Sequence, residues 1–168
     1  MNEGDTKVDT KKVLIDALKS FGTVMVATTL DDGTVHARPM AVADIDDNGV
    51  MWFATEKESP KAQEVKTDAR GLVTGQKGQV FASVSGTYAI VVDRARIEAL
   101  WKPDWKVWFP EGKEDPNIAL MRFAPEIGEY WDNGGTKGVR YLFEAARALV
   151  AGERARPNSK ENHAKVTL

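Results

Sequence analysis

The sequence predicts a mainly β fold, with an antiparallel barrel or sandwich core and helices outside it. Strand-like apolar runs in the first half are joined by short turns rich in Asp, Asn and Gly, and helical patterns occupy the ends and a few connections. The length of 168 residues suits one domain with its own core. We place that domain at residues 1–152 and expect residues 153–168 to be a polar, flexible tail.

The first half is predicted to begin with a helix and to continue as an antiparallel meander. The apolar residues between Val13 and Phe21 share one helical face, and Asp9 or Thr10 can cap this helix. Two short turns, each with an Asp-Gly or Asn-Gly pair, then join three strand-like runs. These strands are expected at residues 23–30, 35–45 and 50–55.

The second half is predicted to add strands and a final helix. Strands are expected at residues 71–75 and 80–92, the latter with a bulge or bend at Ser85-Gly86. Two further strands, at residues 118–123 and 127–131, should be separated by Pro125. An amphipathic helix is expected from Val139 to Val150.

Three of the five tryptophans lie close together in the chain. Trp101, Trp105 and Trp108 have a roughly helical spacing that Pro103 interrupts. We interpret them as a helix and loop that cover one end of the barrel, because large aromatic side chains chiefly supply buried area. The alternative is an aromatic box for a ligand.

Composition excludes several classes of function. The net charge of -2 argues against nucleic-acid binding, and the lack of cysteine excludes disulfides, thiolate nucleophiles and cysteine metal sites. With only His36 and His163, a histidine metal site is not expected. No apolar run approaches the roughly 18 residues of a membrane span, so we expect a cytoplasmic protein without a membrane partner. Glycine-rich phosphate loops and a serine nucleophile elbow are also missing.

The segment from residue 50 to residue 65 is the most informative part of the chain. An apolar run ends in Thr55, and a helix start follows in which Ser59 can cap the backbone N–H groups and Pro60 suits the first position. Lys61 places a cation in the first turn, where a helix favours acidic residues. This combination suits a bound phosphate. The alternative is an ordinary capped helix with a solvated lysine.

Arg38 and Lys57 can add positive charge to this helix start. Arg38 lies on a strand that we expect to pair, through a hairpin, with the strand that ends at Thr55. Arginine can bind phosphate through two donors, and lysine supplies a point charge. Pro39 withholds one ladder donor and indicates a sheet edge or a gap for a ligand. For Arg38 the alternative is a cross-strand ion pair with Asp or Glu.

Five short motifs, taken in order, carry a resemblance to a known family. They are Arg-Pro-Met at 38–40, Trp-Phe-Ala-Thr at 52–55, Ser-Pro-Lys at 59–61, Ser-Val-Ser-Gly-Thr at 83–87 and Glu-Tyr-Trp-Asp at 129–132. From about Lys7 to about Leu149 the chain resembles the pyridoxamine 5'-phosphate oxidase-like FMN-binding split barrels, and most of all their general stress proteins. Such proteins are six- or seven-stranded antiparallel split barrels that form homodimers with two flavins at the dimer interface.

The resemblance implies which residues hold the cofactor, FMN or alternatively FAD. Arg38 and Lys61 would bind the FMN phosphate, assisted by Ser59 and Lys57. The other implied flavin contacts are Pro39, Met40, Phe53, Ala54 and Thr55 within the subunit, and Trp131 with Lys137 or Arg140, which would reach the flavin of the other subunit. For Trp131 the alternative is core packing at a strand end.

One departure from the family limits the expected reaction. True pyridoxamine-phosphate oxidases carry Arg-x-His-Asp-Arg where this chain has Lys-Gly-Val-Arg-Tyr at residues 137–141, so we do not expect vitamin B6 oxidation. Two functions with a flavin remain open. One is a flavin-dependent oxidoreductase for a small molecule that the sequence does not identify, with no catalytic side chain assigned; the other is a non-enzymatic flavin-binding or sensing stress protein. A third possibility is a related split barrel with haem or a deazaflavin; haem would need an axial ligand, and His36 is the only histidine in a predicted strand or helix.

Overall fold

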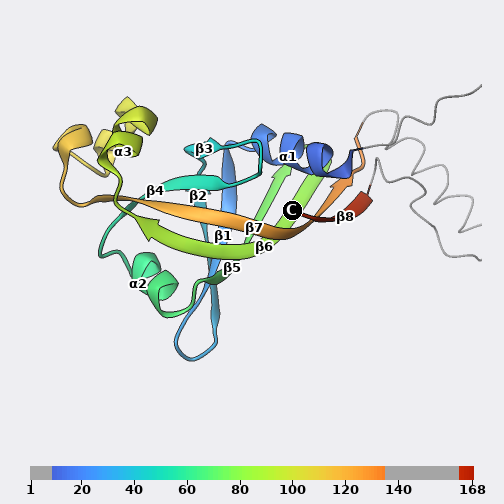
Figure 1. Cartoon of the computed structure of the whole chain (residues 1–168), viewed down its shortest axis with the longest axis horizontal. Helices are drawn as coiled ribbons and strands as arrows, with labels where there is room; N and C mark the ends of the chain where they lie inside the picture. Colours follow the sequence, from blue (N-terminus) through green and yellow to red (C-terminus); the bar gives the residue numbers. More distant parts are fainter. Residues whose placement is uncertain (1–8, 135–162) are drawn as a thin grey trace, which may run out of the picture.

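The computed structural model describes residues 9–134 and 163–168. These residues form a mainly β fold, in which a curled antiparallel sheet makes a half-barrel and three α-helices pack around it (Figure 1). The predicted fold class is confirmed. The helix expected at residues 139–150 lies outside the described residues.

Seven strands follow one another across the sheet in the order β2-β1-β5-β6-β7-β4-β3, and β8 pairs with β7 beside this path. Every pair is antiparallel. The strands are β1 (Thr23–Thr29), β2 (Val35–Ala41), β3 (Asp44–Ile45), β4 (Met51–Glu56), β5 (Arg70–Lys77), β6 (Val80–Val91), β7 (Ile118–Asp132) and β8 (His163–Thr167).

The predicted meander is wrong, because residues 35–45 form two strands at opposite edges of the sheet. β2 pairs with β1, and β3 pairs with β4. Between them, the N–H of Val42 still donates to Gly22 O at 3.0 Å, whereas the N–H of Ala43 donates to Trp52 O at 2.8 Å. The chain therefore changes partner within one residue and closes the half-barrel. The alternation of residue types in this segment does not reveal which strand each half will pair with.

β7 runs without a break through Pro125, which we expected to separate two strands. Opposite Pro125, the pairing of β6 shifts in register between Ser85 and Gly86, where the sequence predicted a bulge. A bulge disrupts the ladder locally, so the missing N–H of the proline is tolerated there. A Cβ at residue 86 would lie only 2.1 Å from Ala124 O, and glycine therefore allows the two strands to approach.

The helices begin at the caps that their sequences provide. They are α1 (Thr10–Ser20), α2 (Pro60–Thr67) and α3 (Arg94–Leu100), and two 3-10 turns follow, η1 (Pro103–Val107) and η2 (Gly112–Glu114). Asp9 caps α1, Ser59 caps α2 and Asp93 caps α3, each accepting a hydrogen bond from a backbone N–H of the first turn. No helix of the described residues is long and apolar enough to cross a bilayer.

The prediction of a flexible tail at residues 153–168 is wrong for its last residues. Residues 163–167 form β8, and Val166 is buried in the main core. Nε2 of His163 lies 2.6 Å from Oε1 of Glu129, and its ring stacks on Trp131 with centroids 5.3 Å apart. The polar character of the tail concealed this strand, since its one buried residue stands among polar neighbours.

Two apolar clusters hold the fold together. The larger one fills the half-barrel beneath α1, with Phe53, Phe123 and Tyr130 fully buried. The smaller one lies under α3 and includes Trp52, Ile97 and Trp105. Trp105 thus packs in the core as expected, whereas Trp108 is 70% exposed.

Candidate functional site

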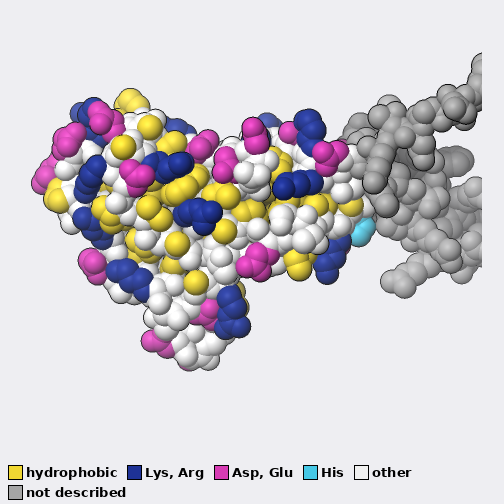
Figure 2. Space-filling view, viewed as in Figure 1, with side chains coloured by type: hydrophobic (Ala, Val, Ile, Leu, Met, Phe, Trp, Pro, Cys, Tyr) yellow, Lys and Arg dark blue, Asp and Glu magenta, His cyan; other side chains and the backbone are white. Residues whose placement is uncertain are grey.

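A cleft of about 510 Å³ lies where β2, the end of β4, the start of α2 and η1 meet. On the face drawn in Figure 2, hydrophobic side chains gather over the middle of the sheet, with Lys and Arg side chains beside them. The residues that line the cleft are Arg38, Pro39, Met40, Ala41, Ala54, Thr55, Glu56, Ser59, Pro60, Lys61, Asp104, Trp105, Trp108 and Phe109. The structure therefore brings together Arg38, Pro39, Met40, Ala54, Thr55, Ser59 and Lys61 of the predicted site.

Arg38 and Thr55 reach the cleft by a different route from the one predicted. We expected a hairpin to pair their strands, but β2 and β4 lie toward opposite ends of the strand order. The curl of the half-barrel, and the crossing of the chain at Val42 and Ala43, bring them to one cleft. The juxtaposition is therefore a product of barrel closure and not of local pairing.

Pro39 occupies a position of β2 that needs no N–H for the ladder. The residues directly before and after β2 are hydrogen-bonded to the β1 side: Thr34 O accepts from Leu30 N, and Val42 N donates to Gly22 O. Hydrogen-bonded and non-bonded pairs alternate along an antiparallel ladder, so the even-numbered residues of β2 are the ones that bond to β1. The odd-numbered residues direct their backbone groups away from β1, toward an edge with no further strand among the described residues. The outward N–H groups near the cleft are therefore those of Ala37 and Ala41, and Pro39 offers only its carbonyl.

The start of α2 forms a compact hydroxyl pair at the floor of the cleft. Ser59 is nearly buried, and its Oγ accepts from Ala62 N at 3.4 Å and donates to Glu56 O at 3.0 Å. Oγ1 of Thr55 lies 3.1 Å from the same Oγ. These contacts fix the first turn, so the helix N-terminus faces the cleft with its partial positive charge.

Lys61 brings a half-buried ammonium group to this helix start. Burial and the positive charge of Arg38 lower the pKa of Lys61, although Glu56 and Glu64 act in the opposite direction. Among the described residues, the ammonium group has neither a hydrogen bond nor an ion pair within 4.0 Å. An anion in the cleft would relieve both the desolvation and the repulsion from Arg38.

Arg38 is held by residues that the sequence analysis did not single out. Its NH1 donates to Thr28 Oγ1 at 2.5 Å, and its NH2 donates to Glu64 Oε2 at 2.7 Å. Thr28 also donates to Glu64, and the guanidinium lies 2.9 Å from Nδ1 of His36. The ion pair foreseen as the alternative for Arg38 thus exists, with a partner on α2 and not on a neighbouring strand.

Glu64 stays ionised in this network. Burial raises the pKa of Glu64, but hydrogen bonds from Thr28 and Arg38 and the charge of Arg38 lower it to a net value below the usual one. The carboxylate therefore fixes the orientation of the guanidinium. Arginine has five N–H donors, so donors remain for a ligand.

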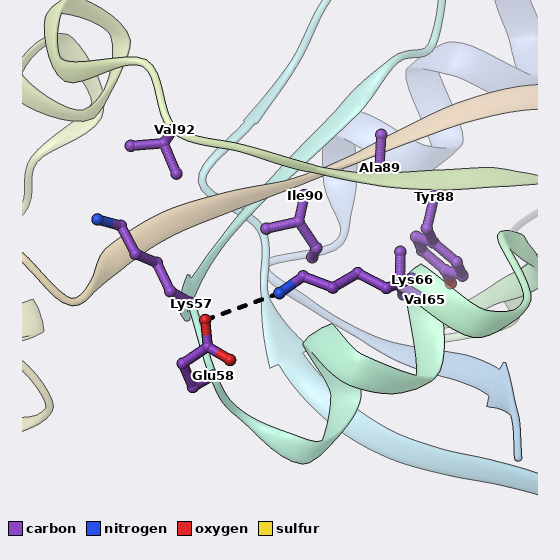
Figure 3. A pocket seen from close by; sticks show the side chains of 8 residues that line it. All are labelled: Lys57, Glu58, Val65, Lys66, Tyr88, Ala89, Ile90 and Val92. Carbon is purple, nitrogen blue, oxygen red and sulfur yellow. Dashed lines mark ion pairs between the residues drawn. The ribbon is translucent and has the colours of Figure 1, made fainter.

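The other predicted site residues lie elsewhere. Phe53 is fully buried in the main core. Lys57 lines a separate cavity of about 370 Å³ (Figure 3). Ile90 and Val92 also line this cavity, as do Lys66 and Glu58, which form an ion pair. Trp131 lies at the far end of β7, against His163. Lys137 and Arg140 fall outside the described residues.

Sequence reasoning missed one wall of the cleft. Asp104, Trp105, Trp108 and Phe109 come from η1 and the turn after it, and they lie across from the start of α2. The clustered tryptophans were the available signal, since an aromatic ligand box was the alternative interpretation of them. One tryptophan of that cluster is core and another is exposed at the cleft.

The histidines give no support to a haem or metal site. His36 does not line the cleft, and its Nδ1 faces Arg38 and Glu64. His163, which falls in the segment expected to be a flexible tail, is engaged by Glu129. The described residues contain no cluster of three or more side chains that could hold a metal ion.

Comparisons with known proteins agree on one group of relatives. Residues 9–156 match the family model described as pyridoxamine 5'-phosphate oxidase like. Protein bli-3 of Neurospora crassa is 30% identical over 92% of this chain and 80% of its own length. A structure assigned to general stress protein 26 of Jannaschia sp. CCS1 superposes with a TM-score of 0.71, at 26% identity over 95% of this chain and 99% of that one. The general stress FMN/FAD binding protein of Xanthomonas citri superposes with a TM-score of 0.65, at 32% identity over 76% and 92% of the two chains.

Proposed function

The chain belongs to the pyridoxamine 5'-phosphate oxidase-like family, and on that premise we propose that it holds FMN in the cleft and acts as a flavin-dependent oxidoreductase on a small molecule. The observation that carries the proposal is the half-buried ammonium group of Lys61, which lies beside Arg38 at the capped start of α2. Among the described residues, no acidic side chain forms an ion pair with this group. The name of the Xanthomonas citri relative, an FMN/FAD binding protein, agrees with a flavin as the ligand.

The residues of the cleft fit a flavin phosphate. Burial and the charge of Arg38 lower the pKa of Lys61, and a dianionic phosphate would compensate both cations. The backbone N–H groups at the first turn of α2 add directional donors. Lys61 would contribute charge, and Arg38, held in place by Glu64, would contribute charge and the N–H donors that Thr28, Glu64 and His36 leave free.

The remaining surface of the cleft fits a largely apolar ring system. Pro39, Met40 and Ala54 supply an apolar wall, and the outward N–H of Ala41 can donate to a polar edge. Bound flavin would supply hydride chemistry at its N5 atom, and the protein would bind and orient it. We propose that pyridoxamine phosphate is not the substrate, because residues 137–141 lack the histidine and aspartate of the true oxidases.

A homodimer is the proposed assembly, and the outer face of the sheet supports it. Cross-strand neighbours form an uncharged row across six strands, made of Ala37, Ala27, Leu72, Ser85, Ile127 and Thr167. Leu72 and Ile127 are 36% and 42% exposed in this row. An uncharged row of this width, with two exposed aliphatic side chains, suits a surface that a second subunit covers. Trp131 is four residues beyond Ile127 on the same face, which would let it approach the cleft of the other subunit.

A specific observation keeps the non-enzymatic function as a second candidate. The described residues that line the cleft include no histidine, cysteine or tyrosine, the side chains most often tuned for proton transfer near neutral pH. A protein of this kind could bind flavin as a store or a signal without turnover.

The two candidates differ in what reduced cofactors do to the bound flavin. Purified protein loaded with FMN is mixed without oxygen with NADH or NADPH, and flavin absorbance is followed before and after an electron acceptor is added. Repeated reduction and reoxidation support the oxidoreductase, and tight binding without turnover supports the second candidate. Protein that binds no FMN contradicts both.

A further inference from the structure

The cleft has two walls of opposite chemical character. One wall carries Arg38 and Lys61 at the start of α2, with Glu56 beside them. The other wall comes from η1 and the turn after it, and carries Asp104 and Trp108 at its surface. A phosphate is attracted to the first wall and repelled by the carboxylate of the second. A ligand that carries both a phosphate and an aromatic ring would therefore direct its ring toward η1.

Trp108 is the exposed aromatic residue of this wall. Its side chain is 70% exposed, whereas Trp105 and Phe109 beside it are 7% and 3% exposed. The core therefore does not need the Trp108 indole. Because Trp108 also lines the cleft, its exposed indole is available to a ligand bound there.

The backbone around Trp108 is firmly held. Its N–H donates to Trp105 O at 2.9 Å, and the N–H of Phe109 donates to the same oxygen at 2.9 Å. Trp105 in turn packs edge-on against Trp101, with ring centroids 5.7 Å apart. The indole is thus presented on a turn that two buried aromatic residues anchor, so a ring that stacks on it meets a largely pre-formed surface.

We propose that Trp108 is the stacking platform for the isoalloxazine ring of the flavin whose phosphate lies at Arg38 and Lys61. This assignment rests on the proposed function and adds a binding residue to it. Neither the order of the motifs nor the match to the family points to Trp108. The assignment also gives a role to the aromatic cluster whose purpose the sequence left open.

Val107 supplies a matched control. It is the neighbour of Trp108 in η1 and is 76% exposed, but it does not line the cleft. Trp108→Ala, Trp108→Phe and Val107→Ala should all fold, because both side chains are on the surface. Thermal unfolding and elution size, measured for each variant, verify the fold and the assembly.

The test is a titration of each full-length variant with FMN, followed by flavin fluorescence. Trp108→Ala should raise the Kd for FMN about tenfold, the usual size of one aromatic stacking contact. Trp108→Phe should recover most of the affinity, and Val107→Ala should match the wild type. Bound FMN should be brighter in Trp108→Ala, because a stacked indole quenches flavin fluorescence.

Inorganic phosphate separates the two proposals. Its own dissociation constant, obtained by competition with FMN and corrected for the Kd of FMN in each protein, should be the same in the wild type and in Trp108→Ala, since it has no ring. If the wild type binds FMN but Trp108→Ala has the same Kd and the same bound-state brightness, the platform is refuted and the phosphate site stands. If Trp108→Ala alters only the elution size, Trp108 serves the subunit contact instead, which also refutes the platform. Wild-type protein that binds neither FMN nor phosphate overturns the proposed function together with this inference.

Discussion

The guanidinium of Arg38 donates to the carboxylate of Glu64 at 2.7 Å and thereby ties the edge strand β2 to the helix α2. Thr28 joins both groups, and it is almost completely buried. The pair adjoins the cleft, because Arg38 lines the cleft and Glu64 lies one helical turn after Lys61, which also lines it. The ion pair is therefore compatible with the phosphate contact that we propose for Arg38, since it fixes the orientation of the guanidinium.

Replacement of Glu64 by glutamine should lower stability in a pH-dependent way. The ionised carboxylate accepts from Thr28 and Arg38, and the loss of charge-assisted bonds should cost about 1–2 kcal/mol at pH 7. Because the folded-state pKa of Glu64 is lowered from 4.5, its contribution is complete above pH 4.5 and is lost as the pH falls through the folded pKa. Urea unfolding from pH 7 to pH 3 should show the two proteins converging at acid pH. A constant difference would contradict this role.

Replacement of Lys61 by methionine should stabilise the ligand-free protein and weaken FMN binding. Burial and Arg38 lower the pKa of Lys61, so the folded state carries an electrostatic cost at neutral pH. The unfolded state retains the proton up to about its usual pKa of 10.5, so this cost fades as the pH rises from the folded pKa toward that value. Melting temperatures should therefore differ most near pH 7 and converge above pH 10.5. A lower melting temperature for Lys61→Met at pH 7 would rule out the proposed cost.

Alanine at Gly86 should destabilise the protein by about 2–4 kcal/mol, the range of overpacked and strained sites. The new Cβ would lie 2.1 Å from Ala124 O, a backbone atom that cannot move without shifting β7 at its proline. Gly22→Ala is the matched control, because a Cβ at residue 22 would meet no other atom within 4 Å among the described residues. Urea denaturation should show a clear loss for the first variant and little change for the second. Equal stabilities would mean that the bulge adapts freely.

A lysine at Leu72 should convert the proposed dimer into monomers. Leu72 lies in the uncharged row of the outer face, where a second subunit would bury the introduced charge. Val92→Lys is the control, since Val92 is 52% exposed, directly follows β6 and lies outside that row. Elution size and light scattering should show a dimer for the wild type and Val92→Lys and a monomer for Leu72→Lys. A monomeric wild type would contradict the homodimer.

Local patterns were enough to predict the fold class and most of the elements. Caps at Asp9 and Ser59, the turn residues and the bulge at Ser85-Gly86 are each set by interactions within a few residues. Pairing between distant segments was harder. The change of partner between Val42 and Ala43, and the passage of β7 through Pro125, depend on strands that the local pattern cannot identify.

For the candidate site too, the local sequence predicted the residues near the start of α2 but not those that distant segments bring to the cleft. Residues close to the helix start, such as Ser59 and Lys61, have chemistry that the local sequence already indicates. Glu64 looked like any exposed helix residue, and its role emerges only because barrel closure brings Arg38 against it. Trp108 and Asp104 lie far along the chain from the helix start, so no spacing linked them to the cleft.

FMN and riboflavin, which differ only in the phosphate, test the central claim most directly. Both ligands are titrated into the wild type and into an Arg38→Ala, Lys61→Ala double variant of the same elution size. The wild type should bind FMN far more tightly than riboflavin, and the double variant should lose about a hundredfold or more in affinity for FMN while its affinity for riboflavin stays nearly unchanged. Equal binding of FMN by both proteins, or a wild type that does not distinguish the two ligands, would contradict a phosphate site at Arg38 and Lys61.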